Sequence, residues 1–410
     1  MDVATASPLS PDTLADNSHY SASPVETAAE NSDLNVVPRT VDVPFHLLGM
    51  SQPTNPSQAL AMEFKGKVLE VPNMMVALEG WPYREKNKYY EQMRDIFNET
   101  LDRVIPDPRR CEKFKECDFA LFSALWWPHA EWEDFYSAAF FALWIFIWDD
   151  TLDGDNSGDR EISDDFEKAS KFRAQTLDYI KHCLGLREEN DGAKPGFPSL
   201  SCGLFEDFSR RVVEKFAKDR VQRVYDEIAR YVHECEVEQT YRLTGRIPTL
   251  DEYLENRLGT SAVFILCGIF ELFVDDALPD WMMKSPEMDV IWRETNLAII
   301  IINDILSLKK EMATESLVSL IPVLYQEGIT WGEIVPELIE ELQLCRLRLE
   351  EAFEKLEKDS AGNARLLKDL RTYVDVCRTS TTGTYIYTIE SKRYKIAQDV
   401  RSDMSATIVL

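Results

Sequence analysis

Apolar residues recur along most of the chain at the three- to four-residue spacing of helices that bury one face. The pattern predicts helices over residues 86–103, 112–126, 132–149, 163–184, 205–243, 250–273, 289–311, 316–326, 330–359 and 366–393. Helix breakers fall between these segments, among them Pro128, Pro248 and Pro279. Because no alternating run of β-branched residues bounded by hairpin turns appears, the predicted fold class is all-α.

The first part of the chain lacks this pattern. Residues up to about 40 are rich in Ser, Ala, Asp, Asn, Thr and Pro and hold almost no aromatic side chains, so they cannot bury enough apolar surface to fold alone. We therefore expect a disordered N-terminal tail over residues 1–42. No linker-like stretch interrupts the rest of the 410 residues, so we expect one domain over residues 43–410.

The balance of charge narrows the classes of partner. With 45 Lys and Arg against 72 Asp and Glu, the net charge is −27. No basic stripe offsets it, which argues against a nucleic-acid partner. The same charge repels an anionic ligand at long range, so a site for such a ligand must bring its own cations.

Cysteine usage and apolar runs indicate the location. The eight cysteines show no C-x-x-C pair and no metal spacing, and several, such as Cys267, sit in apolar helical runs. This favours reduced, buried thiols in a cytoplasmic protein. Residues 1–20 lack the basic start and apolar core of a signal peptide. The longest apolar runs, 135–148 and 261–270, are shorter than the ~20 residues that span a bilayer, so we expect a soluble protein without a membrane span.

The candidate chemistry begins where one apolar run ends. Residues 135–148 are followed by Asp-Asp-Thr-Leu-Asp at positions 149–153. If the run is helical, Asp149 and Asp153 project from one face while Asp150 turns aside. Two like charges at that spacing repel each other unless a hard cation lies between them. Magnesium prefers a few carboxylate oxygens, several waters and substrate phosphate oxygens, so this stretch predicts a magnesium site.

A second polar stretch follows the apolar run 298–302. Asn303, Ser307 and Glu311 step by four residues, so an amide oxygen, a hydroxyl and a carboxylate line one stripe of a helix. This stripe predicts one more magnesium site. Lys310, next to Glu311, is a point charge suited to phosphate.

Each stretch also has a plainer explanation. An Asp-Asp-x-x-Asp stretch is common in acidic chains as a solvated helix end, and Asn, Ser and Glu four residues apart occur by chance on exposed helix faces. Here both stretches come directly after apolar runs of the buried type, 144–148 and 298–302. Because a polar cluster at the end of a buried run needs partners, binding sites for cations are favoured.

With these motifs, the chain resembles the class I terpene synthases, in particular fungal sesquiterpene cyclases of the presilphiperfolanol synthase kind, from about residue 43 to residue 394. Two further marks of that family are present. Its diphosphate-sensing arginine lies 46 positions before the motif asparagine, and 303 − 257 = 46 gives Arg257. Its C-terminal Arg-Tyr pair matches Arg393 and Tyr394.

The resemblance implies a single helical bundle around a central apolar cavity. In it a linear isoprenoid diphosphate, first of all farnesyl diphosphate, is ionised and cyclised to a sesquiterpene hydrocarbon or alcohol with release of diphosphate. Such an enzyme is a carbon–oxygen lyase of isoprenoid secondary metabolism. The resemblance also implies three magnesium ions, held by Asp149, Asp153, Asn303, Ser307 and Glu311. The implied diphosphate ligands are Arg257, Lys310, Arg393 and Tyr394.

The same resemblance implies which residues shape the reaction. Phe122, Phe146 and Tyr387 match aromatic positions around the family's cavity and would stabilise cations. In the family, the helix that carries the diphosphate sensor is broken, so that the carbonyl at the position of Ser261 points at the substrate. Gly259 beside it is equally explained by close helix packing. Tyr387 stands where the family usually has Trp, and it adds a hydroxyl able to hydrogen-bond or to quench a cation.

Other functions remain open. A diterpene cyclase acting on geranylgeranyl diphosphate would share these motifs. A chain-elongating prenyltransferase needs a second aspartate-rich motif, where this chain has Asn303-Asp304-x-x-Ser307. A non-catalytic helical protein would use the cavity to bind a lipid. A haloacid-dehalogenase-type phosphohydrolase would match Asp153-Gly-Asp155, but that loop requires a βαβ setting that the helical pattern lacks. The sequence favours neither a monomer nor a homodimer.

Overall fold

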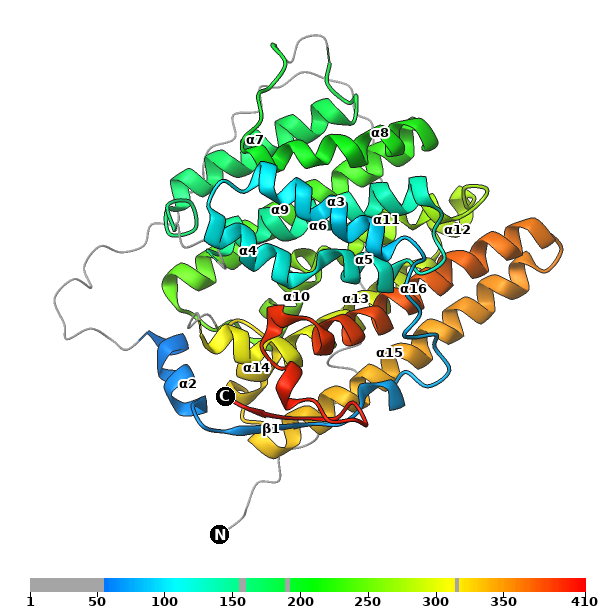
Figure 1. Cartoon of the computed structure of the whole chain (residues 1–410). Coiled ribbons are helices and arrows are strands. Elements are labelled where there is room, and N and C mark those ends of the chain that lie inside the picture. Colours follow the sequence, from blue (N-terminus) through cyan, green and yellow to red (C-terminus); the bar gives the residue numbers. More distant parts are fainter. Residues whose placement is uncertain (1–54, 155–159, 189–191, 314–316) are drawn as a thin grey trace, which may run out of the picture. The chain divides into compact units, whose positions relative to one another are not determined.

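The computed structural model describes residues 55–154, 160–188, 192–313 and 317–410. The predicted tail, residues 1–42, and the predicted start of the domain at residue 43 lie outside the described residues. Within the described part helices dominate, and the predicted all-α class is confirmed (Figure 1).

The elements follow one another in chain order. They are α2 (Pro56–Phe64), β1 (Val68–Val71), η2 (Met74–Val76), α3 (Tyr90–Val104), α4 (Pro108–Cys117), α5 (Phe119–Trp126), α6 (Trp132–Asp153), α7 (Phe166–Cys183), η3 (Leu200–Leu204), α8 (Phe205–Lys215), α9 (Lys218–Thr244), α10 (Leu250–Thr260), α11 (Val263–Ile269), η4 (Phe270–Phe273), α12 (Asp280–Met283), α13 (Pro286–Met312), α14 (Leu320–Gln326), α15 (Trp331–Ser360), α16 (Ala364–Glu390), η5 (Lys392–Tyr394), η6 (Ala397–Asp399) and β2 (Ala406–Val409).

Three segments that the sequence predicts as continuous helices are broken in the structure. Segment 112–126 divides into α4 and α5 at Asp118, whose backbone is left-handed at φ 50°. The Asp118 side chain caps α5 by accepting a hydrogen bond from the Leu121 N–H at 3.0 Å. Segment 205–243 divides into α8 and α9 at the extended residue Ala217. The third break separates α10 from α11 and lies at the candidate site.

The sequence pattern also missed a short sheet. β1 and β2 pair antiparallel, with Val68 opposite Val409 and Val71 opposite Ala406. Strands of four residues carry too short an alternation to stand out in a helical chain, and these two lie far apart in the sequence. The sheet lies beside α15, where the Trp331 indole N–H donates to the Val68 carbonyl oxygen at 2.8 Å.

The core contains two long helices, α6 and α13. A helix that is apolar all round is a buried helix, and α6 fits this rule: Phe141 and Trp144 pack against Phe205 and Phe208 of the α8 region. α13 packs against α10, α11, α15 and α16, and its isoleucine run, 299–302, is buried. The last turns of both helices border one cavity, so the fold brings two distant acidic motifs together.

Two stretches of the described residues are long and apolar enough, on composition alone, to cross a membrane: Trp132–Asp153 and Leu250–Phe273. They are longer than the apolar runs, 135–148 and 261–270, that the sequence pattern singled out. Of the most apolar window in each, 78% and 72% is buried within the protein. Packing in the core therefore accounts for their apolar character.

Candidate active site

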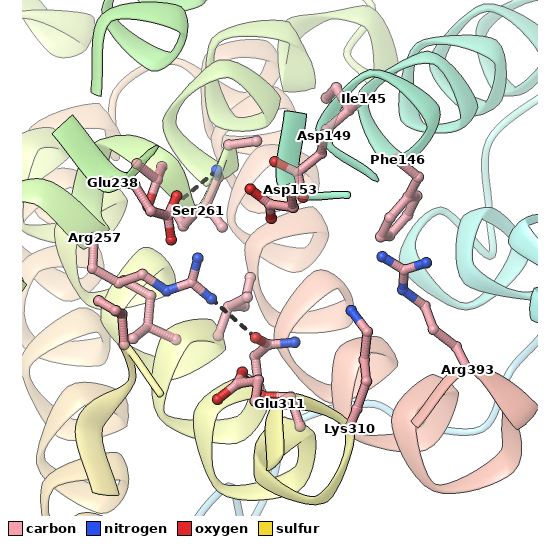
Figure 2. Close-up of a pocket in the computed structure, with 18 of the residues that line it drawn as sticks. Ile145, Phe146, Asp149, Asp153, Glu238, Arg257, Ser261, Lys310, Glu311 and Arg393 are labelled. Carbon is pink, nitrogen blue, oxygen red and sulfur yellow. Dashed lines mark hydrogen bonds between the residues drawn. The ribbon is translucent and has the colours of Figure 1, made fainter. Parts of the chain in front are cut away.

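The cavity has a volume of about 410 Å³ and is bordered by α5, α6, α9, the break between α10 and α11, α13, α16 and η5. Every site residue predicted from the sequence lines it: Phe122, Phe146, Asp149, Asp153, Arg257, Ser261, Asn303, Ser307, Lys310, Glu311, Tyr387, Arg393 and Tyr394. Figure 2 shows acidic side chains of α6, Asp149 and Asp153, across a common space from Lys310 and Glu311 of α13.

One wall of the cavity is the last turn of α6. Asp149 and Asp153 line the cavity, and Asp149 Oδ1 accepts a hydrogen bond from the Tyr231 hydroxyl at 2.9 Å. Burial, and next to it the charge of Asp150, raises the pKa of Asp149. Asp150 is buried and receives both terminal nitrogens of Arg393, at 2.9 and 2.7 Å. The prediction that Asp150 turns aside from the other two is confirmed.

The facing wall is the last part of α13. Arg257 Nη2 donates to Asn303 Oδ1 at 2.9 Å, and Asn303 Nδ2 donates to the Tyr394 hydroxyl at 3.4 Å. One and two turns further on, the Ser307 hydroxyl donates to Glu311 Oε1 at 2.5 Å. Burial raises the pKa of Glu311 to about 7. The predicted stripe of amide, hydroxyl and carboxylate is therefore present.

Asp304 follows Asn303 and turns into the protein, as Asp150 does on α6. It is fully buried and receives hydrogen bonds from Arg257 at 3.3 Å, from the Leu320 N–H at 3.0 Å and from the Tyr253 hydroxyl. The buried acid thus connects α13 to α10 and to the start of α14.

Aromatic rings form the apolar part of the cavity. The Phe122 ring meets Phe146 edge-on at 4.9 Å, Tyr387 edge-on at 5.3 Å and Trp126 at 4.5 Å between ring centroids. The Tyr387 hydroxyl donates to the Cys117 carbonyl oxygen at 2.8 Å. Of the two roles open to this hydroxyl, the structure therefore shows hydrogen bonding to the protein backbone.

The helix break that the family resemblance implies beside Arg257 is present, whereas the apolar pattern alone predicts one continuous helix over 250–273. α10 ends at Thr260, Ala262 adopts a left-handed conformation with φ 61°, and α11 begins at Val263. A non-glycine residue in this conformation is uncommon and is held there by its surroundings. Gly259 has a separate explanation, because a Cβ at that position would overlap the Glu234 side chain of α9. Close helix packing therefore accounts for the glycine.

Sequence reasoning missed the contribution of α9. Tyr231, Glu238 and Arg242 all line the cavity. Burial raises the pKa of Glu238 to about 7, against the opposing charge of Arg257. The three α9 residues stand at i, i+7 and i+11 and so share one helix face, which is the signal that a search for polar stripes in this helix would have found.

Sequence reasoning also missed α2, whose first turn borders the cavity. Asn55 and Gln58 are among the lining residues. Ser57 holds the helix in place, since its N–H donates to the Gly245 carbonyl oxygen at 3.2 Å and its hydroxyl accepts from the Leu317 N–H at 2.9 Å. Gly245 has φ 64°, and a Cβ there would overlap the Asn55 side chain. Glycine therefore allows α2 to lie this close.

The donors in this cavity fit a hard divalent cation. Carboxylate, amide and hydroxyl oxygens are the ligands that magnesium prefers. Across the described part of the chain, no group of three or more His, Cys, Asp or Glu side chains is arranged to hold a metal, so the fitting set is the mixed one that includes Asn303 and Ser307. Burial raises the pKa of Asp149, Glu238 and Glu311, and a cation bound in the cavity would stabilise their charged forms.

Known proteins share these features. Residues 141–343 match the family model "Terpene synthase family 2, C-terminal metal binding". The chain is 27% identical over 365 residues to the sesquiterpene cyclase hepA of Aspergillus oryzae (strain ATCC 42149 / RIB 40), covering 86% of this chain and 96% of that protein. It is 24% identical over 353 residues to the terpene cyclase braA of Annulohypoxylon truncatum, covering 83% and 90%.

A solved structure shows the same fold. The linalool/nerolidol synthase from Streptomyces clavuligerus, in complex with 2-fluorogeranyl diphosphate, matches with a TM-score of 0.64 at 18% identity, over 77% of this chain and 98% of that one.

The family model and the relatives define the class, and the solved structure shows the same fold: the chain is a class I terpene synthase. It is a terpene cyclase, and it resembles the sesquiterpene cyclase hepA and the silphinene synthase peniA of Penicillium patulum over most of its length. The family implies an isoprenoid diphosphate as the substrate and a divalent metal in the site.

Proposed function

We propose that this terpene cyclase uses magnesium to ionise farnesyl diphosphate and cyclises the resulting cation to a sesquiterpene hydrocarbon or alcohol. One observation carries the proposal: a single cavity combines aromatic and aliphatic walls with carboxylate, amide, hydroxyl and cationic groups. The hydrocarbon chain needs an apolar surface that excludes water, whereas the diphosphate needs cations.

Magnesium would be held between the two acidic walls. The ligands that we assign to three ions are Asp149, Asp153, Asn303, Ser307 and Glu311. When bound, the metal supplies Lewis-acid charge that stabilises the departing diphosphate. Tyr231 orients Asp149 through its hydroxyl at 2.9 Å, and Ser307 orients Glu311 at 2.5 Å, so both walls have their carboxylates aligned by neighbouring hydroxyls.

Cationic groups of the chain would bind the diphosphate. We assign this role to Arg257, Lys310 and Arg393, together with the Tyr394 hydroxyl, all of which line the cavity. These donors stabilise negative charge as the carbon–oxygen bond breaks, so catalysis rests on preorganised electrostatics rather than on a covalent enzyme intermediate.

The aromatic part of the cavity would receive the allylic cation. The ring faces of Phe122, Phe146 and Tyr387 carry negative quadrupole potential, which stabilises positive charge. Ser261, at the break, adds the carbonyl end of α10 to the same cavity, and a helix C-terminus carries partial negative charge. We assign the final proton to the released diphosphate, because it is the strongest base that the reaction itself supplies.

Two observations favour a fifteen-carbon substrate over geranylgeranyl diphosphate. The cavity of about 410 Å³ lies toward the lower end of the roughly 300–1,000 Å³ of ligand pockets. A relative that matches 86% of this chain is named as a sesquiterpene cyclase. We further propose a cytoplasmic location, since all eight cysteines are free thiols and most are buried.

The test is incubation of the purified protein with ten-, fifteen- and twenty-carbon diphosphates, with magnesium or with a chelator, followed by gas chromatography with mass spectrometry and a diphosphate assay. We expect one main fifteen-carbon cyclic product and no release with the chelator. A twenty-carbon product would identify a diterpene cyclase. Longer chains formed with added isopentenyl diphosphate would identify a prenyltransferase. Release of inorganic phosphate alone would indicate a phosphohydrolase. Binding without release would indicate a lipid-binding protein.

A further inference from the structure

Asn296 is a buried polar side chain that no motif marks. It lies on α13, is fully buried, and uses both ends of its amide on the helix break. Nδ2 donates to the Leu258 carbonyl oxygen at 2.8 Å, and Oδ1 lies 2.6 Å from the Ser261 hydroxyl. A buried amide that is satisfied by one short segment of a neighbouring helix fixes the conformation of that segment.

The hydrogen bonds follow from the break itself. The Ser261 N–H is the last backbone donor of α10 and bonds to the Arg257 carbonyl oxygen at 3.0 Å. In an unbroken helix, the next carbonyl, Leu258, would accept from Ala262. Ala262 is instead left-handed, and the Asn296 amide takes its place on Leu258. The side chain therefore replaces a hydrogen bond that the break removes.

The direction of the Ser261 hydroxyl proton can be deduced from these contacts. The Leu258 carbonyl oxygen can only accept, so the NH₂ end of Asn296 faces it and the carbonyl end faces Ser261. Because Asn296 Oδ1 can also only accept, the Ser261 hydroxyl must donate to it. The Leu258 oxygen is a second acceptor for this proton, but at 3.4 Å against 2.6 Å it is the weaker one.

The lone pairs of the Ser261 hydroxyl oxygen point away from its proton and carry partial negative charge. One lone pair accepts from the Val263 N–H at 3.2 Å, and the hydroxyl proton is held by Asn296. Ser261 lines the cavity, and we infer that the remaining lone pair of its hydroxyl faces the cavity. A hydroxyl held in this way keeps the negative end of its dipole toward a cation and needs no reorientation during the reaction.

Asn296 also connects the α10–α11 break to the wall of the cavity that α13 forms. It precedes Asn303 by seven residues on α13, so the two share one face of the helix. Arg257, one residue before Leu258, donates to Asn303 at 2.9 Å. The break is therefore fixed to the α13 face at two points.

We propose, resting on the proposed function, that Asn296 is a positioning residue of the cyclisation: its amide holds the α10–α11 break so that the Ser261 hydroxyl turns its oxygen, and not its proton, toward the carbocation. Asn296 itself does not line the cavity, so it acts through Ser261. Loss of the Asn296 amide should change the step at which the carbocation is quenched, and with it the products. Diphosphate release and substrate affinity depend on the α6 and α13 walls instead.

The experiment compares Asn296→Ala, Ser261→Ala and the double variant. The matched control is Asn256→Ala, which removes another buried asparagine amide that bonds outside the cavity, to Glu234 of α9 at 2.9 Å. Product distribution, Km for farnesyl diphosphate and the rate of diphosphate release are measured together with thermal stability. Asn296→Asp is added because it can still accept from Ser261 although it cannot donate to Leu258.

We expect the share of acyclic or incompletely cyclised product to rise about tenfold in Ser261→Ala and Asn296→Ala, with Km within about twofold of wild type. The double variant should be no worse than Asn296→Ala, because the hydroxyl is already misaligned there. Asn296→Asp should lie closer to the wild-type profile than Asn296→Ala. Asn256→Ala should lower stability and leave the profile unchanged.

An unchanged profile in Ser261→Ala would overturn the inference, as would additive effects of the single variants or an equal shift in Asn256→Ala. If the Asn296 variants do not fold, Ser261→Ala alone decides, since it removes one hydroxyl from a half-buried position. Failure of the proposed function looks different, because wild-type protein would then form no cyclic product from farnesyl diphosphate, and the inference would fall with it.

Discussion

The two acidic walls of the cavity are built to the same plan. On α6, Asp149 lines the cavity while its neighbour Asp150 turns into the protein and pairs with Arg393. On α13, Asn303 lines the cavity while its neighbour Asp304 turns into the protein and pairs with Arg257. In each wall the first residue lines the cavity, where we propose that it binds a metal, and the second is a buried acid that is paired with an arginine.

The walls differ in how firmly the arginine is held. Arg393 gives both terminal nitrogens to Asp150 in a bidentate pair, the geometry in which arginine is not replaceable by lysine. Arg257 divides one nitrogen between Asn303 and Asp304, and Asp304 is also supported by the Leu320 N–H. The loss of the guanidinium fork at Arg257, with a cation kept, should therefore cost the fold less than the same change at Arg393.

The largest effect on activity should come from changes at Asp149 and Asn303, the first residue of each wall. We expect Asp149→Asn and Asn303→Ala each to abolish turnover, a loss of more than about 1,000-fold, because each removes a metal ligand from the rim and not a core contact. Diphosphate release at saturating magnesium measures the loss, and circular dichroism should show an unchanged helical signal. Near wild-type activity in either variant would mean that the metal-binding assignment is wrong.

The second effect should separate the two arginines. We expect Arg257→Lys and Arg393→Lys each to slow ionisation by about 10- to 1,000-fold, with more early-quenched product, because the charge remains but the planar fork is lost. Only Arg393→Lys should also lower the free energy of unfolding, by about 1.5–3 kcal/mol for a hydrogen bond to a charged group. Single-turnover kinetics and urea denaturation of both variants test this. Equal losses of stability would remove the distinction between the walls.

Periodicity is what made the walls predictable. Asp149 and Asp153, like Asn303, Ser307 and Glu311, repeat every four residues along one helix, so spacing alone places them on a shared face. Arg257 and Arg393 lie outside these helices, and only the resemblance to the family marks them, Arg257 by its distance from Asn303 along the chain and Arg393 by the Arg-Tyr pair.

Other features depend on contacts between distant parts of the chain. Asn296 belongs to no motif, and only its contacts with α10 and with Ser261 reveal its role. The left-handed Ala262 depends on partners that the local pattern does not reveal, and β1 pairs with a strand near the other end of the chain. No local rule predicts such features, because their energy comes from tertiary packing rather than from propensity.

A smaller effect should come from the third side of the cavity, which α16 supplies through Tyr387. Tyr387→Phe should keep the product profile, because its hydroxyl donates to the Cys117 carbonyl oxygen at 2.8 Å. The same carbonyl accepts from the Ser391 hydroxyl at 3.0 Å, so it stays satisfied and the variant should lose only about 0.5–1.5 kcal/mol of stability. Gas chromatography and thermal melting measure the two quantities. A changed product profile would show that the hydroxyl acts in the cavity after all.

The smallest effect should come from deleting the predicted N-terminal tail. A shorter and a longer deletion together show how far the α13 wall depends on the start of the chain. Deleting residues 2–35 should leave kinetics and melting temperature nearly unchanged, because that composition cannot bury a core. Deleting residues 2–64 also removes α2, and with it the Ser57 contact to Leu317 and the fully buried Phe64, whose ring lies 5.1 Å from Tyr325 of α14. The longer deletion should therefore lower both stability and activity. A large loss of activity already in the shorter deletion would show instead that residues 2–35 contribute to the site.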